Sequence, residues 1–467
     1  MKNIIIEIDT NKIDDYKKFI KCKQLPYYKI EGNKIITDEE SYNFVFGKNN
    51  KSSYKYENID NYLFDYQYYL VNKALERKRY AVFADCGLGK TRVEILFAKT
   101  LNEKVLLLCP LSVMNDIIQE ANTLNIPISN LRTEKWKEKL AIINFENMKA
   151  IDMRGVKGII LDESSILKNG DGVIRKYLTE LASNIEYRLC ASATPSPNEQ
   201  SEYASHSVFL GYSSTLKEFY SQFFRKDGTN WILKAHAVDK FYENLVSWSC
   251  YIQKPSLLGF ELGCELPFDP DYRLIETKDP YKIDDYSLFT SSITLQEANK
   301  IVFGKLRCDD TIERFNKSID CIKDDQSIIW CSRNNEEHIY YKRLKEKAVL
   351  ITGSTPIEKR VDLINDFRKG NIQYLISKPK ILGFGVNIPQ ATSMLYSGYN
   401  YSFEEFYQAV RRSHRYGRHE RLKVYIPQSD IEKPIWEILQ SKLRTFEDDI
   451  LKLQKLFFKD FQNRSNK

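Results

Sequence analysis

Short runs of apolar residues recur along two stretches of this chain, and segments with helical spacing separate them. An apolar run that no polar residue interrupts is typical of a parallel strand buried on both faces of its sheet. Strands that alternate with helices predict a doubly wound α/β fold. The pattern therefore predicts two such domains in tandem, with strands at 80–83, 105–109, 140–144, 158–161 and 188–191 in the first and at 327–331, 349–352, 374–377, 393–396 and 422–426 in the second.

The flanking and connecting segments show other patterns. Residues 4–8 predict a strand, and a hairpin is expected around Glu31-Gly32-Asn33. Near the C-terminus, leucines at helical spacing among many charges predict one long amphipathic helix, which we interpret as a packing helix. The expected organisation is an N-terminal appendage (1–58), a first α/β domain (59–210), a helical or connecting segment (211–299), a second α/β domain (300–430) and a C-terminal helix (431–467).

Composition narrows the class of protein. A hydrophobic content of 42% and a charged content of 28% in 467 residues fit a packed chain of two or three domains. The net charge of +7 permits a polyanion partner without requiring one. The nine cysteines include no Cys-x-x-Cys pair, which favours reduced thiols over a zinc site or a disulfide framework. No signal-peptide pattern and no apolar stretch of membrane-spanning length stand out, so a cytoplasmic location without membrane contact is expected.

A glycine-rich loop stands between the first predicted strand and the following helix. Its sequence, Ala84-Asp85-Cys86-Gly87-Leu88-Gly89-Lys90-Thr91, has the strand, loop, Lys-Thr and helix order of a phosphate-binding loop. The glycines let backbone N–H groups turn toward a polyphosphate, and the helix start adds partial positive charge. Lys90 is expected to reach the β- and γ-phosphates, and the Thr91 hydroxyl to bind Mg²⁺. Because Ala84 holds the place of the first glycine, a simple glycine turn is the alternative.

Two adjacent acids, Asp162 and Glu163, follow the predicted strand 158–161. In a phosphate-loop enzyme, Asp162 would hold Mg²⁺, commonly through water, and Glu163 would polarise the attacking water. A helix cap is the alternative role for such a pair. After another predicted strand, the hydroxyls of Ser192-Ala193-Thr194 could link the metal site to the second domain or form a polar turn.

The densest basic cluster of the chain runs from Gln408 to Arg418. The three-residue spacing of Arg412 and Arg415 predicts that both side chains lie on one face of a helix. Two guanidinium groups on one face suit a phosphoryl transition state whose charge spreads over three oxygens. A solvated basic face, or a contact with a polyanion, is the alternative. Upstream, the sequence Gly-Phe-Gly-Val-Asn at 383–387 predicts a flexible loop that can approach a ligand closely.

Taken in order, these motifs resemble a superfamily 2 helicase or translocase ATPase with two RecA-like domains. The resemblance covers about residues 60–430, and its details are similar to Swi/Snf-type motors and to the DEAD-like helicases common in bacteriophages. Ser164 and Ser165 replace the usual third and fourth residues of motif II. The matching segments are the glutamine motif (64–67), motif I (84–91), motif Ia (109–113), motif Ib (143–146), motif II (162–165), motif III (192–194), motif IV (329–333), the helix pattern of Gly353, Arg360 and Phe367, motif V (383–387) and motif VI (408–415).

The resemblance implies specific roles for matched residues. Gln67 would read adenine, and Gly385 and Asn387 of motif V would join the glycine loop in binding the nucleotide. Arg412 and Arg415 would act as arginine fingers. Gln408, in the same motif, is a further catalytic candidate.

The resemblance also implies an activity and its partners. The chain is expected to be a nucleic-acid-dependent ATPase that uses ATP and Mg²⁺ and moves along or unwinds DNA. Duplex DNA is the preferred track, and a protein partner is left open. The alternatives are an RNA helicase and a nucleic-acid-binding module that uses ATP as a switch with little turnover.

Overall fold

The computed structural model describes residues 3–8, 15, 18, 19, 22, 29–38, 42, 63–168, 172–228, 230–253, 255, 269–277, 311–382, 387–415, 418, 420–429 and 432–465. The chain divides into two compact units, which are described separately. Unit 1 comprises Met1–Leu262 and Glu447–Lys467, and unit 2 comprises Gly263–Phe446.

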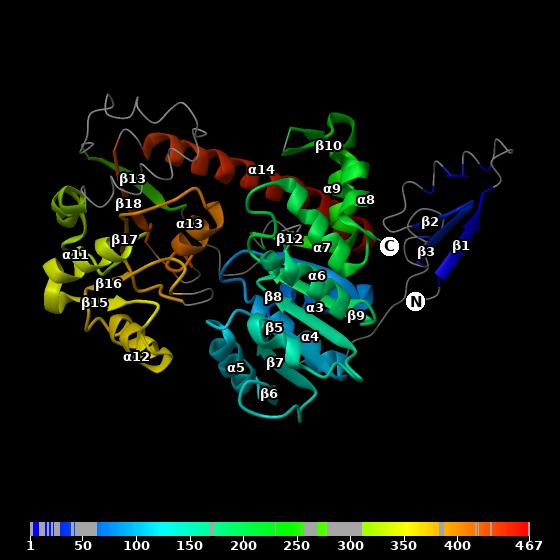
Figure 1. The fold of residues 1–467 in the computed structure, drawn as a ribbon, viewed down its shortest axis with the longest axis horizontal. Coiled ribbons are helices and arrows are strands. Elements are labelled where there is room, and N and C mark those ends of the chain that lie inside the picture. Colours follow the sequence, from blue (N-terminus) through cyan, green and yellow to red (C-terminus); the bar gives the residue numbers. More distant parts are fainter. Residues whose placement is uncertain are drawn as a thin grey trace. The chain divides into compact units, whose positions relative to one another are not determined.

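A small antiparallel sheet belongs to the N-terminal segment. Its strands β1 (Asn3–Glu7), β3 (Lys34–Asp38) and β2 (Lys29–Glu31) lie in the order β1-β3-β2 (Figure 1). Ile6 on β1 and Ile35 on β3 form a small buried cluster with Ile8. The predicted N-terminal strand and hairpin are therefore confirmed.

Unit 1 is built on a seven-stranded sheet whose neighbouring strands all pair in parallel. Its order is β12-β4-β9-β8-β5-β7-β6. The inner strands form because their apolar runs are buried on both faces: every residue of β5, β7 and β8 is buried. The strands are β4 (Arg79–Ala84), β5 (Val105–Cys109), β6 (Ile128–Asn130), β7 (Leu140–Asn144), β8 (Gly158–Asp162), β9 (Tyr187–Ser192) and β12 (Ser249–Ile252).

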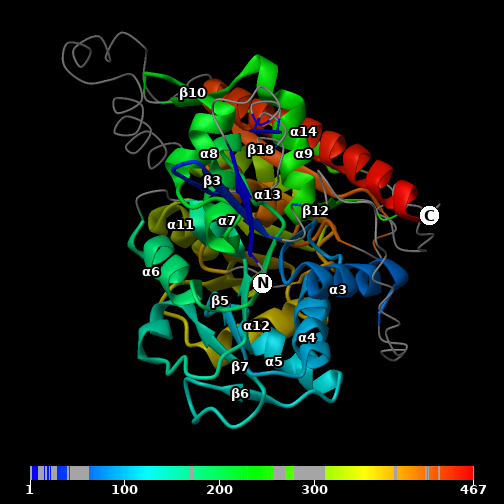
Figure 2. The same ribbon diagram turned by 90° about the vertical axis from the view of Figure 1, so that its right-hand side faces the viewer.

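Helices lie on both sides of this sheet, as a doubly wound fold requires. Figure 2 shows α3 and α4 on one side and α6 and α7 on the other. The short α7 is buried along its whole length. The helices of unit 1 are α3 (Asp65–Arg77), α4 (Lys90–Leu101), α5 (Met114–Thr123), α6 (Val173–Ala182), α7 (Tyr203–Leu210), α8 (Leu216–Phe223) and α9 (Val238–Trp248), with 3-10 turns η1 (Phe145–Ala150), η2 (Ser164–Lys168), η3 (Gln200–Glu202) and η4 (Ala235–Ala237).

The segment after residue 210 contributes to the sheet of unit 1. Strand β12 pairs in parallel with β4, the strand that leads into the glycine loop. Before it, β10 (Phe224–Asp227) and β11 (Asn230–Leu233) form an antiparallel hairpin. The domain end expected at residue 210 therefore falls before the last strand of the sheet, and unit 1 extends to Leu262.

Unit 2 contains a second parallel sheet, of six strands in the order β13-β18-β17-β14-β16-β15. Helices α11 (Asn334–Leu344) and α12 (Ile357–Arg368) pack against β15 and β16. All five strands predicted from apolar runs are present, and β13 is an additional strand at one edge. The strands are β13 (Asp271–Glu276), β14 (Ser327–Trp330), β15 (Ala348–Ile351), β16 (Tyr374–Ser377), β17 (Ser393–Tyr396) and β18 (Lys423–Gln428), with the turn η7 (Lys345–Lys347) after α11.

Two further helices complete the chain. Helix α13 (Phe403–Val410) belongs to unit 2, and its N-terminus is capped by the Ser402 hydroxyl, which accepts from the backbone N–H of Glu405. The long helix α14 (Lys433–Ser465) confirms the predicted C-terminal helix. No helix in the described part of the chain combines the length and apolar character needed to cross a lipid bilayer.

Candidate nucleotide site and arginine cluster

Three neighbouring strands of unit 1 carry the motifs predicted around a nucleotide. Strand β9 lies between β4, which leads into the glycine loop, and β8, which ends in the acid pair. In register, Phe83 faces Ser192, and Ala191 faces Asp162. Because the strands are parallel, motifs I, II and III all emerge at the carboxyl edge of the sheet, where α/β folds bind ligands.

The glycine loop has the backbone geometry that its sequence predicts. Gly87 and Gly89 have φ angles of 88° and 71°, in the left-handed region that glycine adopts readily. Gly89 is the N-cap of α4, so the first helical residue is Lys90. The Lys90 ammonium donates to the carbonyls of Ala84, at 2.9 Å, and Asp85, at 3.3 Å. The lysine therefore lies back across the loop, and the carbonyl of the alanine that replaces the first glycine is one of its acceptors.

The glutamine motif is attached directly to this loop. Gln67 is buried, and its Nε2 donates to the Leu88 carbonyl at 3.0 Å, while its Oε1 accepts from the Phe64 N–H at 3.1 Å. The Tyr66 hydroxyl donates to the same Leu88 carbonyl at 2.7 Å. The φ of Gly89 favours glycine, and a Cβ there would lie 2.2 Å from Gln67 Nε2, so the glutamine side chain would have to shift. Tyr66 was not predicted, and Phe64, 43% exposed, presents an aromatic face beside it.

The acid pair ends strand β8 in an unusual backbone conformation. Asp162 is the last strand residue and is buried, whereas Glu163 is half-buried with a φ of 53°. Burial raises the pKa of Asp162, and the nearby Lys90 charge opposes that shift. The oxygen donors Asp162 and Thr91 are of the kind that Mg²⁺ prefers, and Mg²⁺ takes its remaining ligands from water and substrate phosphates. The described residues contain no group of three or more His, Cys, Asp or Glu side chains placed to hold a metal ion.

A buried glutamate on the first helix of the site escaped sequence analysis. Glu94 lies one turn after Lys90 on α4 and is fully buried. Burial, together with the charge of Asp162, raises the pKa of Glu94 well above its usual range. The neutral form of Glu94 is therefore favoured beside Asp162. A glutamate inside the apolar stretch 93–98 was the only sequence signal for this arrangement.

Motif III is held by contacts within unit 1. The Ser192 hydroxyl accepts from the Thr194 N–H at 3.1 Å, and both side chains are fully buried. The hydroxyl of Tyr251, on β12, donates to the Ala193 carbonyl at 2.8 Å. Tyr251 was not predicted, because it lies about 60 residues further along the chain and reaches motif III only through the edge strand.

The basic cluster of unit 2 differs from its predicted geometry. Helix α13 ends at Val410, so Arg412 and Arg415 follow the helix instead of sharing one of its faces. The expectation of a common helix face is wrong, because the chain turns after Val410: the N–H of Arg415 donates to the Ser413 carbonyl, only two residues back. Arg412 is buried, and Arg415 is half-buried.

Neighbouring side chains fix this turn. Arg415 Nε donates to the Arg411 carbonyl at 2.9 Å. The Arg411 guanidinium lies 4.9 Å from the centre of the Tyr407 ring and donates to its hydroxyl at 3.0 Å. Gln408, one residue after that tyrosine, is buried. Arg411 is thus part of the packing of motif VI. The sequence alone could not show which arginine of the basic cluster has this role.

Motif V is only partly described. Gly385 lies outside the described residues. Asn387 is exposed, and its carbonyl accepts from Nη2 of Arg368 on α12 at 2.6 Å. The next residue, Ile388, donates its N–H to the Arg412 carbonyl at 2.9 Å. A backbone hydrogen bond therefore joins the end of motif V to the turn at residues 411–415, which we call the arginine turn.

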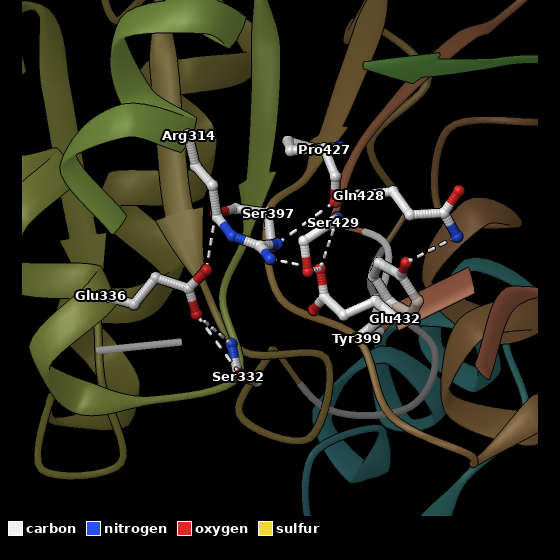
Figure 3. A network of polar contacts seen from close by, with 9 residues as sticks. All are labelled: Arg314, Ser332, Glu336, Ser397, Tyr399, Pro427, Gln428, Ser429 and Glu432. Atoms are coloured by element: carbon white, nitrogen blue, oxygen red, sulfur yellow. Dashed lines mark hydrogen bonds and ion pairs between the residues drawn. The ribbon is translucent and has the colours of Figure 1, made fainter. Parts of the chain in front are cut away.

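A buried polar network holds the carboxyl ends of three strands in unit 2 (Figure 3). Arg314 donates to the carbonyls of Ser397, at 3.0 Å, and Pro427, at 3.2 Å, and pairs with Glu432. Glu336 accepts from the Ser397 hydroxyl. Both members of the Arg314–Glu432 pair are 2% exposed, so neither can lose its partner without leaving a buried charge. This network joins residues more than 100 positions apart, and no motif of the sequence predicts it.

Comparison with known proteins agrees with this architecture. The helicase conserved C-terminal domain matches residues 310–417, a range that includes Gln408, Arg412 and Arg415. Among solved structures, the chain is similar to Dbp5 from S. cerevisiae bound to RNA and ADP BeF3, with 13% identity, coverage of 83% of this chain and 93% of that chain, and a TM-score of 0.50. It also matches the Sulfolobus solfataricus SWI2/SNF2 ATPase core in complex with dsDNA, with 18% identity, coverage of 79% and 88%, and a TM-score of 0.40. No curated protein matches the chain.

These findings confirm the fold class expected from the motifs. The fold is that of tandem RecA-like helicases, with two parallel α/β sheets. The helicase conserved C-terminal domain matched at residues 310–417 agrees with the superfamily 2 resemblance of the motifs.

Proposed function

We propose that this protein couples ATP hydrolysis to translocation along duplex DNA. The observation that carries the ATPase part is the convergence of Lys90, Asp162 and Glu163 at the ends of nearby parallel strands in unit 1. A cation at a helix start and two acids at a strand end are what a triphosphate with its metal ion requires.

Within this proposal, Lys90 binds the β- and γ-phosphates. Its present acceptors are two loop carbonyls, so the ammonium is already held across the loop before a phosphate replaces them. Mg²⁺, when bound, neutralises charge that develops on the phosphate oxygens. Thr91 and Asp162 would hold it, and the Lys90 charge counteracts the burial that disfavours ionised Asp162.

Glu163 accepts the proton of the attacking water in this proposal. Its left-handed backbone directs the residue out of the line of strand β8 while Asp162 stays at the strand end. Adjacent acids can then perform different tasks, one on the metal and one on the water. Non-glycine residues with such a φ are uncommon and cluster at functional sites.

Nucleotide recognition is assigned to the glycine loop and its surroundings. We assign adenine recognition to Gln67, whose contacts with the loop couple base binding to loop geometry. Gly385 and Asn387 are proposed as nucleotide contacts from motif V. Arg412 and Arg415 are proposed as arginine fingers that stabilise the transition state, with Gln408 in support.

The choice of duplex DNA rests on the similarity of the motifs to Swi/Snf-type motors. In the helix pattern of that resemblance, Arg360 donates to the carbonyls of Gly353 and Thr355, each at 2.8 Å, and Phe367 is fully buried. These residues therefore have defined contacts in unit 2. RNA is the competing track, since Dbp5 is seen bound to RNA.

The test is steady-state phosphate release with duplex DNA, single-stranded DNA and RNA at matched nucleotide concentrations. We expect the strongest stimulation by duplex DNA, and displacement of a triplex-forming strand in the presence of ATP. Affinity for duplex should fall with salt at a slope of about −0.9 per neutralised phosphate. Stimulation by RNA alone would replace DNA with RNA as the track, and no stimulation by any nucleic acid would favour an ATP switch.

The residue roles are tested with Glu163→Gln. This variant should bind ATP within about threefold of the wild type yet lose hydrolysis, because the proposed metal ligand Asp162 is unchanged. Glu180→Gln, exposed on α6, is the matched control and should keep full activity. Loss of ATP binding in Glu163→Gln would show that Glu163 belongs to the metal or phosphate site instead.

A further inference from the structure

The backbone at Glu163 needs support from its surroundings. Its φ of 53° lies in the left-handed region, which costs free energy for any residue with a side chain. Such conformations persist only where neighbouring structure over-determines them. The residues that follow enter the turn η2, and the Ile166 N–H donates to the Glu163 carbonyl at 3.2 Å. That bond is local, so a contact with another element is required to fix the turn within the unit.

The next residue makes such a contact. Ser164 is fully buried, and its hydroxyl lies 3.1 Å from Nε2 of His206, which is also fully buried. His206 belongs to α7, which follows motif III, and 42 positions separate the two residues. The Cys190 thiol, on β9, also lies against the Ser164 hydroxyl. Ser164, which follows the proposed water-activating residue Glu163, is thus hydrogen-bonded to helix α7.

The imidazole that receives this contact is itself held in place. The Phe83 ring, on β4, packs edge-on against it, with centroids 5.2 Å apart and an interplanar angle of 86°. Burial lowers the pKa of His206 to about 4, so the ring is neutral at pH 7. A neutral ring has one donor and one acceptor nitrogen, and either tautomer can pair with a hydroxyl. His206 therefore contacts both the strand that leads into the glycine loop and the turn that carries the acid pair.

We propose that His206 is a positioning residue for ATP hydrolysis, which holds the Ser164 hydroxyl and thereby fixes the turn that orients Glu163. This inference rests on the proposed role of Glu163 as the residue that activates water. His206 acts through Ser164 and need not touch the substrate.

The polar character of the pair argues for this role over simple packing. All residues of α7 are buried, including the apolar Val208, Phe209 and Leu210. A leucine at position 206 and an alanine at 164 would fill such a core without burying polar atoms, which costs free energy even when they are paired. A directional bond, unlike an apolar contact, defines the rotation of the turn. The Ser164–His206 pair lies beside Glu163, so a rotation of the turn would move the Glu163 carboxylate.

The experiment compares Ser164→Ala, His206→Leu and the double variant. We expect each single variant to lose kcat by on the order of 10-fold to 100-fold at saturating ATP and nucleic acid, the scale of a slightly misplaced catalytic group. ATP affinity should stay within about threefold of wild type, because the phosphate loop is unchanged. The double variant should be as impaired in kcat as either single variant, since both changes remove the same bond.

Two matched controls separate positioning from packing. Ser207→Ala removes another buried hydroxyl bond of α7, the 2.9 Å contact with Ser213, and should lower the melting temperature while kcat stays unchanged. Cys190→Ala removes the other neighbour of Ser164 and should also keep kcat. If His206→Leu does not fold, the smaller change Ser164→Ala decides the question by the same measurements.

Several outcomes would overturn the proposal. Wild-type kcat in Ser164→Ala would do so, as would recovery of wild-type kcat in the double variant, because an apolar pair would then serve equally well. Glu163→Gln distinguishes this failure from failure of the proposed function. If Glu163→Gln is inactive while Ser164→Ala and His206→Leu turn over normally, only the role of His206 is wrong. If Glu163→Gln hydrolyses ATP, the role of Glu163 itself is wrong.

Discussion

Motifs predicted both the glycine loop of unit 1 and the arginine pair of unit 2, but only the glycine loop has the expected local geometry. Lys90 begins a helix and Asp162 ends a strand, as the pattern predicts. Arg412 and Arg415 follow α13 after its last residue and do not share a helix face. A residue at the end of a buried strand is fixed by the sheet, whereas spacing along a helix has meaning only while the helix continues.

The two regions also differ in how their charges are satisfied. In unit 1, Asp162 is buried near Glu94, and burial raises the pKa of both carboxyls, with Lys90 opposing the shift at Asp162. In unit 2, the arginine turn is satisfied by its own chain, since Arg415 Nε donates to the Arg411 carbonyl. The charge of Lys90 thus favours ionised Asp162 in unit 1, whereas Arg415 in unit 2 is bonded to a carbonyl of its own chain.

The largest expected effect comes from removing the cation of the glycine loop. Lys90→Ala should lower ATP turnover by on the order of 10³-fold or more, because a charge-assisted phosphate contact is lost. Lys99→Ala, exposed on the same helix, is the control and should keep full turnover. Phosphate release at saturating nucleic acid measures both. Wild-type turnover in Lys90→Ala would remove the ATP site from this loop.

The arginine turn is expected to show the next largest effect. Arg415→Ala should lose on the order of 10³-fold in kcat at saturating ATP and nucleic acid, as removal of an arginine finger does. Arg412→Ala should behave similarly. The measurement is kcat as a function of nucleic-acid concentration.

The alternative for these arginines predicts a different curve. A residue that only binds nucleic acid weakens affinity, so its variant regains the wild-type rate once enough nucleic acid is added. Full recovery in both variants would assign the turn to nucleic-acid binding. Lys90 and the two arginines would then differ in function as well as in local geometry.

The fold was predictable where strands are central and less so at the edges. Strands β5 and β7 coincide with predicted apolar runs, because burial on both faces favours apolar residues along the strand, with Asn144 at the end of β7 as the exception. Within the two parallel sheets, the pattern missed β6, β12 and β13, each of which pairs with one neighbour at a sheet edge. Strands β6 and β12 are only three and four residues long, and β13 (Asp271–Glu276) has a mixed sequence with no buried residue.

The candidate site was predictable where a motif is contiguous in sequence. The glycine loop and the acid pair fall within eight residues and two residues, respectively, and local backbone chemistry determines their form. Contacts such as Tyr251 with Ala193, or His206 with Ser164, join segments 58 and 42 positions apart. No spacing rule reports such pairs, since they depend on how helices and edge strands pack against the sheet.

A smaller effect is expected from Gly89→Ala, which tests the geometry of the loop itself. Left-handed φ and a Cβ 2.2 Å from Gln67 Nε2 should together lower the free energy of unfolding by about 2 to 4 kcal/mol. Chemical denaturation measures this loss. In Gly89→Ala combined with Gln67→Ala, the clash disappears and the φ cost remains, so the two changes should not be additive. Additive losses would mean that the Gln67–loop contact does not constrain Gly89.

The smallest effect concerns a buried acid of unit 2 that belongs to no proposed site. Glu337, near the start of α11, is 1% exposed, and burial raises its pKa to about 6, although Lys378 at 3.6 Å opposes the shift. An unfolded glutamate has a pKa of about 4.3, so the folded state binds the proton more tightly. The stabilisation from this proton is full below the unfolded pKa and is lost as the pH rises through 6.

Glu337→Gln stays neutral at every pH and should therefore gain stability relative to wild type as the pH rises. The difference in unfolding free energy should increase by about 2 kcal/mol between pH 4.5 and pH 7.5. Urea unfolding of the intact chain at the two pH values measures it, and Glu346→Gln, an exposed glutamate of unit 2, should show no such change. If the difference in unfolding free energy between the variant and the wild type does not change with pH, then folding does not shift the pKa of Glu337. Unit 2 would then lack the buried-acid behaviour that distinguishes Asp162 and Glu94 in unit 1.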